Sequence, residues 1–165
     1  MRITTLAEYG VICALHLARR ADEGPVTGRD IAERERLPAD YVEQILLRLR
    51  RADIVRSTRG ARGGYALARA AESISIRDVI EASEETTFDL HCVTHPVGEE
   101  RCSSAQTCSI RPVWMLLQRK IDDVLDGVRL SDLLLEESAV RERVGLVAAG
   151  TSPESTGARE LPVLH

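Results

Sequence analysis

Three cysteines lie close together in the second half of this 165-residue chain, and their thiolates are the side chains best suited to chemistry. Cys92, Cys102 and Cys108 are separated by gaps of nine and five residues. This spacing is too irregular for the paired Cys-x-x-Cys knuckles of a zinc ribbon. Soft thiolates on one loop suit an iron–sulfur cluster. A zinc site that includes a histidine, or a bare thiol switch, remains an alternative.

The composition excludes several classes of protein. Hydrophobic residues make up 44% and charged residues 29% of the chain, which is enough to build a core and argues against disorder. No run approaches the roughly 18 apolar residues of a membrane span, and the N-terminus does not resemble a signal peptide. We therefore expect a cytoplasmic protein with no membrane partner. The sequence contains no nucleophile–base set, phosphate loop or cofactor fingerprint, so we expect neither an enzyme nor a small-molecule substrate.

The first half of the chain predicts a helix-turn-helix and a wing. One helix is expected from Arg29 to about Glu35, with Thr27 as its N-cap, and a longer helix begins after Pro38. The second helix has an apolar stripe with a period of 3.6 residues, formed by Val42, Ile45, Leu46 and Leu49. Two β-compatible stretches, 54–57 and 65–67, flank a loop rich in Gly and Arg and predict a hairpin.

Three further segments predict helices. The first, over 5–20, has helical apolar spacing that includes Cys13, which we expect in the core, whereas His16 is expected to be structural. A capping box beginning at Ser75 predicts a short helix over 75–82. The last helix, over 110–126, is expected to be capped by Ser109, and its apolar stripe is broad enough to face both its own domain and a partner helix.

The positive charge is concentrated on the second helix and the wing. Between Leu46 and Arg69 seven arginines accompany only one acid, Asp53, a local charge of +6 in a chain of net charge −4. Arginines in such a stripe can neutralise phosphates and release counterions, which predicts binding to double-stranded DNA. For the Arg48–Arg51 segment alone, a solvated and salt-bridged helix face is the alternative.

Base recognition is expected from the first half of the second helix. Gln44 could pair with adenine and Glu43 could accept from cytosine, although Glu43 could instead form a salt bridge with a neighbour such as Arg50. Arg59, at the tip of the wing, suits a narrow minor groove. The remaining candidate DNA contacts are Thr27, Arg29, Asp40, Tyr41, Arg48, Arg51 and Arg62.

The motifs occur in the order found in a known family. They are MRITT at 1–5, DIAE at 30–33, YVEQIL at 41–46, LRRA at 49–52, RGARGGYALAR at 59–69 and ISIRDVI at 74–80. Over about residues 1–135 the chain resembles the Rrf2-type bacterial transcription regulators, which include IscR-like, NsrR-like and RirA-like branches. The resemblance implies a homodimer with the helix at 110–126 as its dimer helix.

The expected fold is therefore mainly α with a small β-hairpin wing, a winged helix-turn-helix plus a long dimerisation helix. We divide the chain into a DNA-binding domain (1–82), a cysteine cluster loop (83–109) and a dimerisation helix region (110–137). A C-terminal extension (138–165) is expected to be flexible, because after about Gly150 its sequence is rich in Thr, Ser, Pro and Gly.

The resemblance also implies a set of cluster ligands. In the cluster-bearing branches three cysteines occupy the same loop, so Cys92, Cys102 and Cys108 match the ligands. IscR-like members have a histidine three residues after the third cysteine, where this chain has Arg111. NsrR-like members complete a [4Fe–4S] cluster with an acidic residue from the first helix of the other subunit, and Glu8 matches it. This favours [4Fe–4S] over [2Fe–2S], with the rival fourth ligands being solvent, His91 and His95.

Overall fold

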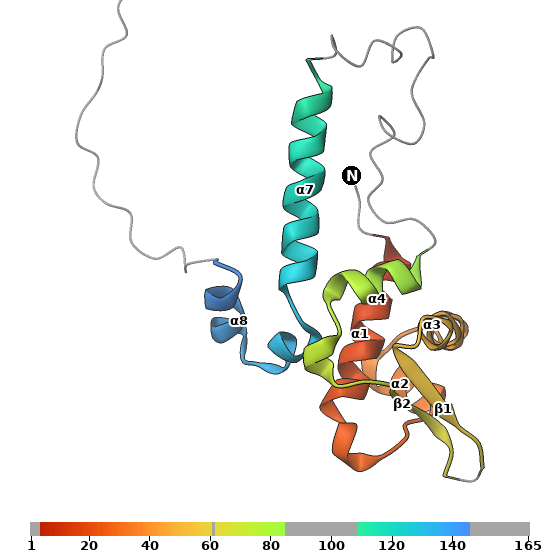
Figure 1. Cartoon of the computed structure of the whole chain (residues 1–165). Helices are drawn as coiled ribbons and strands as arrows, with labels where there is room; N and C mark the ends of the chain where they lie inside the picture. Colours follow the sequence, from red (N-terminus) through yellow and green to blue (C-terminus); the bar gives the residue numbers. More distant parts are fainter. Residues whose placement is uncertain (1–3, 61, 85–108, 146–165) are drawn as a thin grey trace, which may run out of the picture.

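The computed structural model describes residues 4–60, 62–84 and 109–145 (Figure 1). Within these ranges the chain is mostly helical, with one two-stranded antiparallel sheet, as the sequence predicts. The elements in chain order are α1 (Thr5–Arg19), η1 (Ala21–Glu23), α2 (Gly28–Glu35), α3 (Ala39–Arg51), β1 (Val55–Thr58), β2 (Gly64–Leu67), η2 (Ala71–Ser73), α4 (Ile76–Ser83), α7 (Arg111–Gly127), η3 (Leu130–Leu134) and α8 (Glu137–Arg143).

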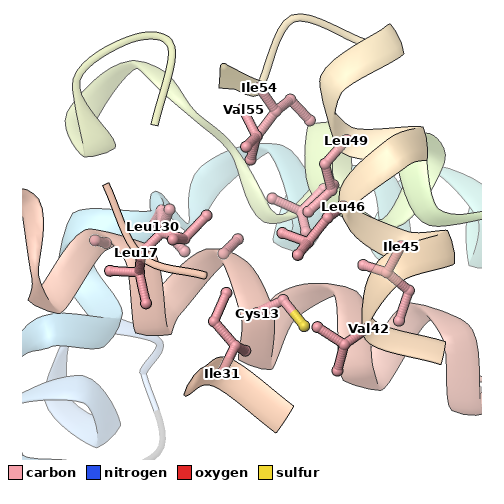
Figure 2. Packing of buried hydrophobic residues seen from close by; sticks show 14 of the residues in the cluster. Cys13, Leu17, Ile31, Val42, Ile45, Leu46, Leu49, Ile54, Val55 and Leu130 are labelled. Atoms are coloured by element: carbon pink, nitrogen blue, oxygen red, sulfur yellow. The ribbon is translucent and has the colours of Figure 1, made fainter. Parts of the chain in front are cut away.

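The core lies where α1 packs against α3 and α4, with α2 and the hairpin closing its edges. The apolar stripe predicted for α3 is entirely buried, and Figure 2 shows its side chains facing those of α1 and α2. Cys13 lies among them with no exposed surface, which confirms its prediction as a core residue. Burial, followed by the negative charge of Glu35, raises the pKa of the Cys13 thiol to about 12.

Local hydrogen bonds explain where several of these helices begin. The Thr27 hydroxyl accepts from the amide of Asp30 at 3.1 Å, and Ser75 and Asp78 form a reciprocal capping box with two 3.0 Å bonds. Both predicted caps are thus confirmed. The cap predicted at Ser109 is wrong, because α7 begins one residue later than expected and its N-cap is Ile110, with no side-chain bond.

The hairpin wing is attached to the chain that enters α2. Its strands pair from Val55 opposite Leu67 to Thr58 opposite Gly64. On the other edge of β2, the backbone of Tyr65 exchanges two hydrogen bonds with Val26, at 2.7 and 2.8 Å. A Cβ at Gly64 would collide with the Val26 carbonyl, so this close approach of two backbones requires glycine.

The helix α7 projects from the bundle, and among the described elements its main neighbour is α4 (Figure 1). Arg77 of α4 forms ion pairs with Asp122 and, at 3.0 Å, with Asp126 of α7. The chain then returns to the bundle, where Leu130 of η3 is fully buried. No residue of α7 is buried. The last helix of the described residues, α8, lies across the predicted boundary at 137/138. No described helix is long and apolar enough to span a membrane.

Candidate nucleic-acid interface

The helices α2 and α3 form the predicted helix-turn-helix. Arg36 ends α2 in the left-handed conformation, with φ of 56°, and the Leu37 amide donates to the Ala32 carbonyl at 3.0 Å. This tight turn lets the apolar side of α3 pack inside, so its opposite side must face outward. The four predicted base-reading residues all lie on that outward side, and all are exposed: Asp40, Tyr41, Glu43 and Gln44.

Two of these exposed residues are held by aromatic neighbours. The Tyr41 ring lies edge-on to that of Tyr9, with the ring centroids 6.0 Å apart. The Tyr65 hydroxyl, from the wing, donates to Glu43 Oε2 at 3.3 Å. The salt bridge considered between Glu43 and Arg50 is not formed among the described residues, where Arg50 instead donates to the Ser57 hydroxyl at 3.3 Å.

Four arginines at the end of α3 and on the wing are exposed, and none forms an ion pair with a residue of 4–60, 62–84 or 109–145. They are Arg51, Arg56, Arg59 and Arg62. Exposed guanidinium groups without an acidic partner keep their charge available for an external anion such as a phosphate. The structure therefore leaves these four side chains, together called the cationic surface, exposed at the end of α3 and along the wing.

Arg48 has a different environment from these four arginines. It is half-buried, and its Nη1 donates to the carbonyl of Ser83, the last residue of α4, at 2.6 Å. This bond satisfies one of the carbonyls that a helix leaves unpaired at its C-terminus. It also joins α3 to the residue that ends α4, just before the cysteine-containing segment. Nothing in the local sequence around either residue indicates this contact.

The two predicted contacts at the start of α2 are both exposed. Arg29 pairs with Glu33 one turn later at 2.7 Å, and this hydrogen bond raises the pKa of its guanidinium group. The Thr27 hydroxyl accepts the capping bond from Asp30, and its own proton remains able to donate to another acceptor. Any contact between Arg29 and DNA must therefore compete with Glu33.

The side of the bundle formed by α1 and α2 carries paired charges instead. Buried His16 contacts Glu35 at 2.6 Å through Nδ1, consistent with its expected structural role. Asp30 accepts from Arg20 at 2.6 Å and from Arg34 at 2.8 Å. The hydrogen bond from Arg34, and then the charges of Arg34, Arg20 and His16, hold the pKa of Asp30 below its ordinary value, although desolvation opposes them.

The three loop cysteines, Cys92, Cys102 and Cys108, lie outside the described residues. Glu8 is exposed in the first turn of α1. The amide of the preceding residue, Ala7, donates to Glu84 Oε1 at 3.2 Å. The first turn of α1 therefore lies beside Glu84, the C-cap of α4. Among residues 4–60, 62–84 and 109–145, no group of three His, Cys, Asp or Glu side chains could hold a metal ion.

A helix-turn-helix followed by a hairpin wing, with exposed cations on both, defines the class of winged helix-turn-helix transcriptional regulators. The match to a family model extends across nearly all of the described chain. The chain belongs to the Rrf2 family, described as iron-dependent transcriptional regulators, whose model matches residues 3–136. The resemblance seen in the sequence motifs is thereby confirmed.

Individual relatives agree with this assignment. IscR of Erwinia tasmaniensis is 36% identical over 134 residues, which cover 81% of this chain and 79% of that protein. The structure of T. potens IscR has a TM-score of 0.64 and 35% identity, covering 81% of this chain and 86% of that one. CymR (YrzC), the global cysteine regulator of B. subtilis, has a TM-score of 0.66 and 30% identity, covering 81% and 95%. The relatives are transcriptional regulators, a non-enzymatic class, as expected.

Proposed function

We propose that the chain is a cytoplasmic regulator that binds a double-stranded DNA operator as a homodimer, with an affinity set by an iron–sulfur cluster. The observation that carries DNA binding is the cationic surface of Arg51, Arg56, Arg59 and Arg62, exposed and without ion pairs to described residues. Placed on a winged helix-turn-helix, this surface lies where phosphates flank the groove that receives the second helix.

The proposed contacts divide into two groups. Asp40, Tyr41, Glu43 and Gln44 face the base edges from α3. Thr27, Arg29, Arg48, Arg51 and Arg62 contact the phosphate backbone, while Arg59 enters the minor groove from the wing. Base contacts specify sequence and phosphate contacts fix the register of the protein on DNA, so the two groups should respond differently to salt.

A salt titration of paired variants tests DNA binding. We would replace Arg59 and Arg62 together with alanine and compare this variant with Arg34→Ala, whose guanidinium group already pairs with Asp30. Binding to DNA from the chain's own promoter is measured by fluorescence anisotropy at several salt concentrations. Each lost phosphate contact lowers the salt slope by about one, so the double variant should bind about tenfold more weakly with a smaller slope. Unchanged affinity and slope would overturn the proposal.

The homodimer is supported by the exposed apolar stripe of α7. Its residues recur with helical spacing, and four of them are exposed: Val113 at 59%, Trp114 at 39%, Leu117 at 37% and Val124 at 60%. Apolar stripes of this extent on a surface mark an interaction site. A second copy of the same helix supplies an equally apolar partner, as a two-fold interface requires.

For the cluster, we propose Cys92, Cys102, Cys108 and Glu8 as ligands and [4Fe–4S] as the cluster type. Three thiolates and one carboxylate are donors that such a cluster accepts. Glu8 is exposed in the first turn of α1, so its carboxylate is accessible to the cluster of the other subunit, as the NsrR-like pattern requires. Loss, oxidation or nitrosylation of the cluster would shift the population between two dimer geometries with different DNA affinities.

Anaerobic absorption and EPR spectroscopy test the cluster directly. Protein purified without oxygen should be brown, and Cys102→Ala should lose the colour. Glu8→Ala should change the EPR spectrum or the rate of cluster loss, whereas Glu72→Ala, an exposed control, should not. Gel shifts with and without the cluster then compare operator affinity. A colourless, iron-free preparation from iron-replete anaerobic cells would overturn the cluster assignment.

The alternative is a regulator that senses through thiol oxidation or zinc without a cluster. It is favoured by the likeness to CymR, because a protein named as a global cysteine regulator shares this fold. Metal analysis separates the two functions, since iron with acid-labile sulfide is expected for a cluster, and zinc or no metal for the alternative. Whether the signal is nitric oxide, iron or the redox state follows from which of them changes the operator affinity of the loaded protein.

A further inference from the structure

The carboxylate of Glu43 is held by two elements outside α3. Tyr65 of β2 donates to its Oε2 at 3.3 Å, and on its other side the carboxylate packs over Gly28, the first residue of α2. A Cβ at Gly28 would collide with Glu43 Oε1, so the absence of a side chain at this position makes room for the carboxylate. One exposed acid of the recognition helix is therefore fixed between the wing and the start of α2.

Tyr65 is itself firmly placed. Its backbone pairs with Ser57 across the hairpin and exchanges two hydrogen bonds with Val26 on the opposite side. Its ring is half-buried. Burial, followed by the charge of Glu43 and the hydrogen bond to it, raises the pKa of the Tyr65 hydroxyl above its ordinary value of 10. At neutral pH the phenol thus keeps its proton and can donate it to Glu43.

We propose that Tyr65 is a positioning residue that orients the Glu43 carboxylate, so that the wing helps to set the base preference of the recognition helix. This inference rests on the proposed function, in which Glu43 faces a base edge. A carboxylate accepts from the exocyclic amine of cytosine only from a narrow range of positions. An exposed glutamate has several rotamers, and the hydrogen bond from the Tyr65 hydroxyl restricts them.

A double-mutant cycle tests the proposal. Wild type, Tyr65→Phe, Glu43→Ala and the double variant are each used to select bound sequences from a randomised DNA library, and relative affinities follow from sequencing. Tyr65→Phe removes only the hydroxyl, so the fold should be retained. We expect it to change base preference by about two- to tenfold, the worth of one hydrogen bond, at the same operator position that Glu43→Ala changes. In the Glu43→Ala background it should have no further effect.

Two more variants separate positioning from general structural damage. In Gly28→Ala the added methyl group should displace the Glu43 carboxylate by steric contact, and it should alter the base preference at the same operator position. Tyr9→Phe removes a hydroxyl from a ring that contacts Tyr41, and it should leave the preference at that position unchanged. Additive effects of Tyr65→Phe and Glu43→Ala, or changes at unrelated positions, would overturn this inference alone. A wild type that selects no sequence would overturn the proposed function as well.

Discussion

The helices α3 and α7 are both amphipathic, yet among the described residues only α3 packs its apolar stripe against other helices. On α3, four apolar side chains are fully buried against α1, α2 and α4, whereas α7 has no buried residue. The difference does not come from the helices themselves, because each has an apolar stripe of comparable extent. Among residues 4–60, 62–84 and 109–145, the bundle covers the stripe of α3 and leaves that of α7 exposed, so α3 stabilises the domain and α7 fits its proposed role as the dimer helix.

The largest effect should come from a substitution that creates a cavity in the core beneath α3. Leu46 is 0% exposed and Leu47, its neighbour, is 36% exposed. Leu46→Ala should lower the free energy of unfolding by about 2–5 kcal/mol, since it removes buried methyl groups that neighbours cannot replace. Leu47→Ala should cost about 0.5 kcal/mol or less. Urea denaturation measures both, and equal losses would show that α3 does not carry the core.

A charge on the apolar stripe of α7 should act on assembly rather than on folding. Val124 is 60% exposed, and Asp123 lies next to it on the polar side of the helix. Val124→Arg should raise the dissociation constant of the dimer by about 100-fold or more, because an unpaired charge would be buried at the interface. Asp123→Arg should change it only slightly. Analytical ultracentrifugation gives both constants, and a Val124→Arg protein that dimerises like wild type would refute α7 as the interface.

The starts of the helices provide a smaller contrast. Ser75→Ala removes one half of a capping box at α4 and should lower the free energy of unfolding by about 1 kcal/mol. Ser109 lies before the N-cap of α7, so Ser109→Ala should change stability by no more than about 0.3 kcal/mol. Thermal unfolding of the two alanine variants compares them. Equal shifts of Tm would show that the box at α4 contributes nothing specific.

The smallest effect concerns the ionic contacts of Asp30, which pairs with Arg34 within α2 and with Arg20 at the end of α1. Because the folded state lowers the pKa of Asp30, mainly through the bond from Arg34, the ionised carboxylate stabilises the fold. This contribution is complete above the ordinary pKa of 3.8 and is lost as the pH falls through the lower folded value. Asp30→Asn should flatten the acid limb of a plot of urea midpoint against pH. An acid limb identical to wild type would contradict this.

Much of the fold follows from local signals in the sequence. The N-caps at Thr27 and Ser75, the stripe of α3 and the Gly-rich turn of the wing each depend on residues a few positions apart, so their elements could be predicted. The start of α7 was misplaced because a serine in the right place can cap only if the helix begins directly after it. The helix α8 has too short a pattern to be distinguished from a tail.

The contacts within the candidate site could not be predicted in the same way. Tyr65 and Glu43 are 22 residues apart, Arg48 and Ser83 are 35 apart, and Ala7 and Glu84 are 77 apart. Each contact depends on how α1, α3, α4 and the wing pack, and no periodicity encodes that. The sequence showed that Arg48 carries charge, but its bond to the Ser83 carbonyl depends on where α4 ends. The roles of the cysteines stay predictions, because Cys92, Cys102 and Cys108 lie outside the described residues.

The burial of Cys13 provides an internal probe of the bundle. A thiol with no exposed surface and a pKa of about 12 barely reacts with alkylating reagents while the protein stays folded. Its labelling must wait until α1 separates from α3, so the alkylation rate of this one peptide, followed by mass spectrometry, reports the free energy of that opening. A ligand that binds only the folded state slows the reaction in proportion to its occupancy. The alkylation rate of Cys13 should therefore report operator binding without a label on the DNA.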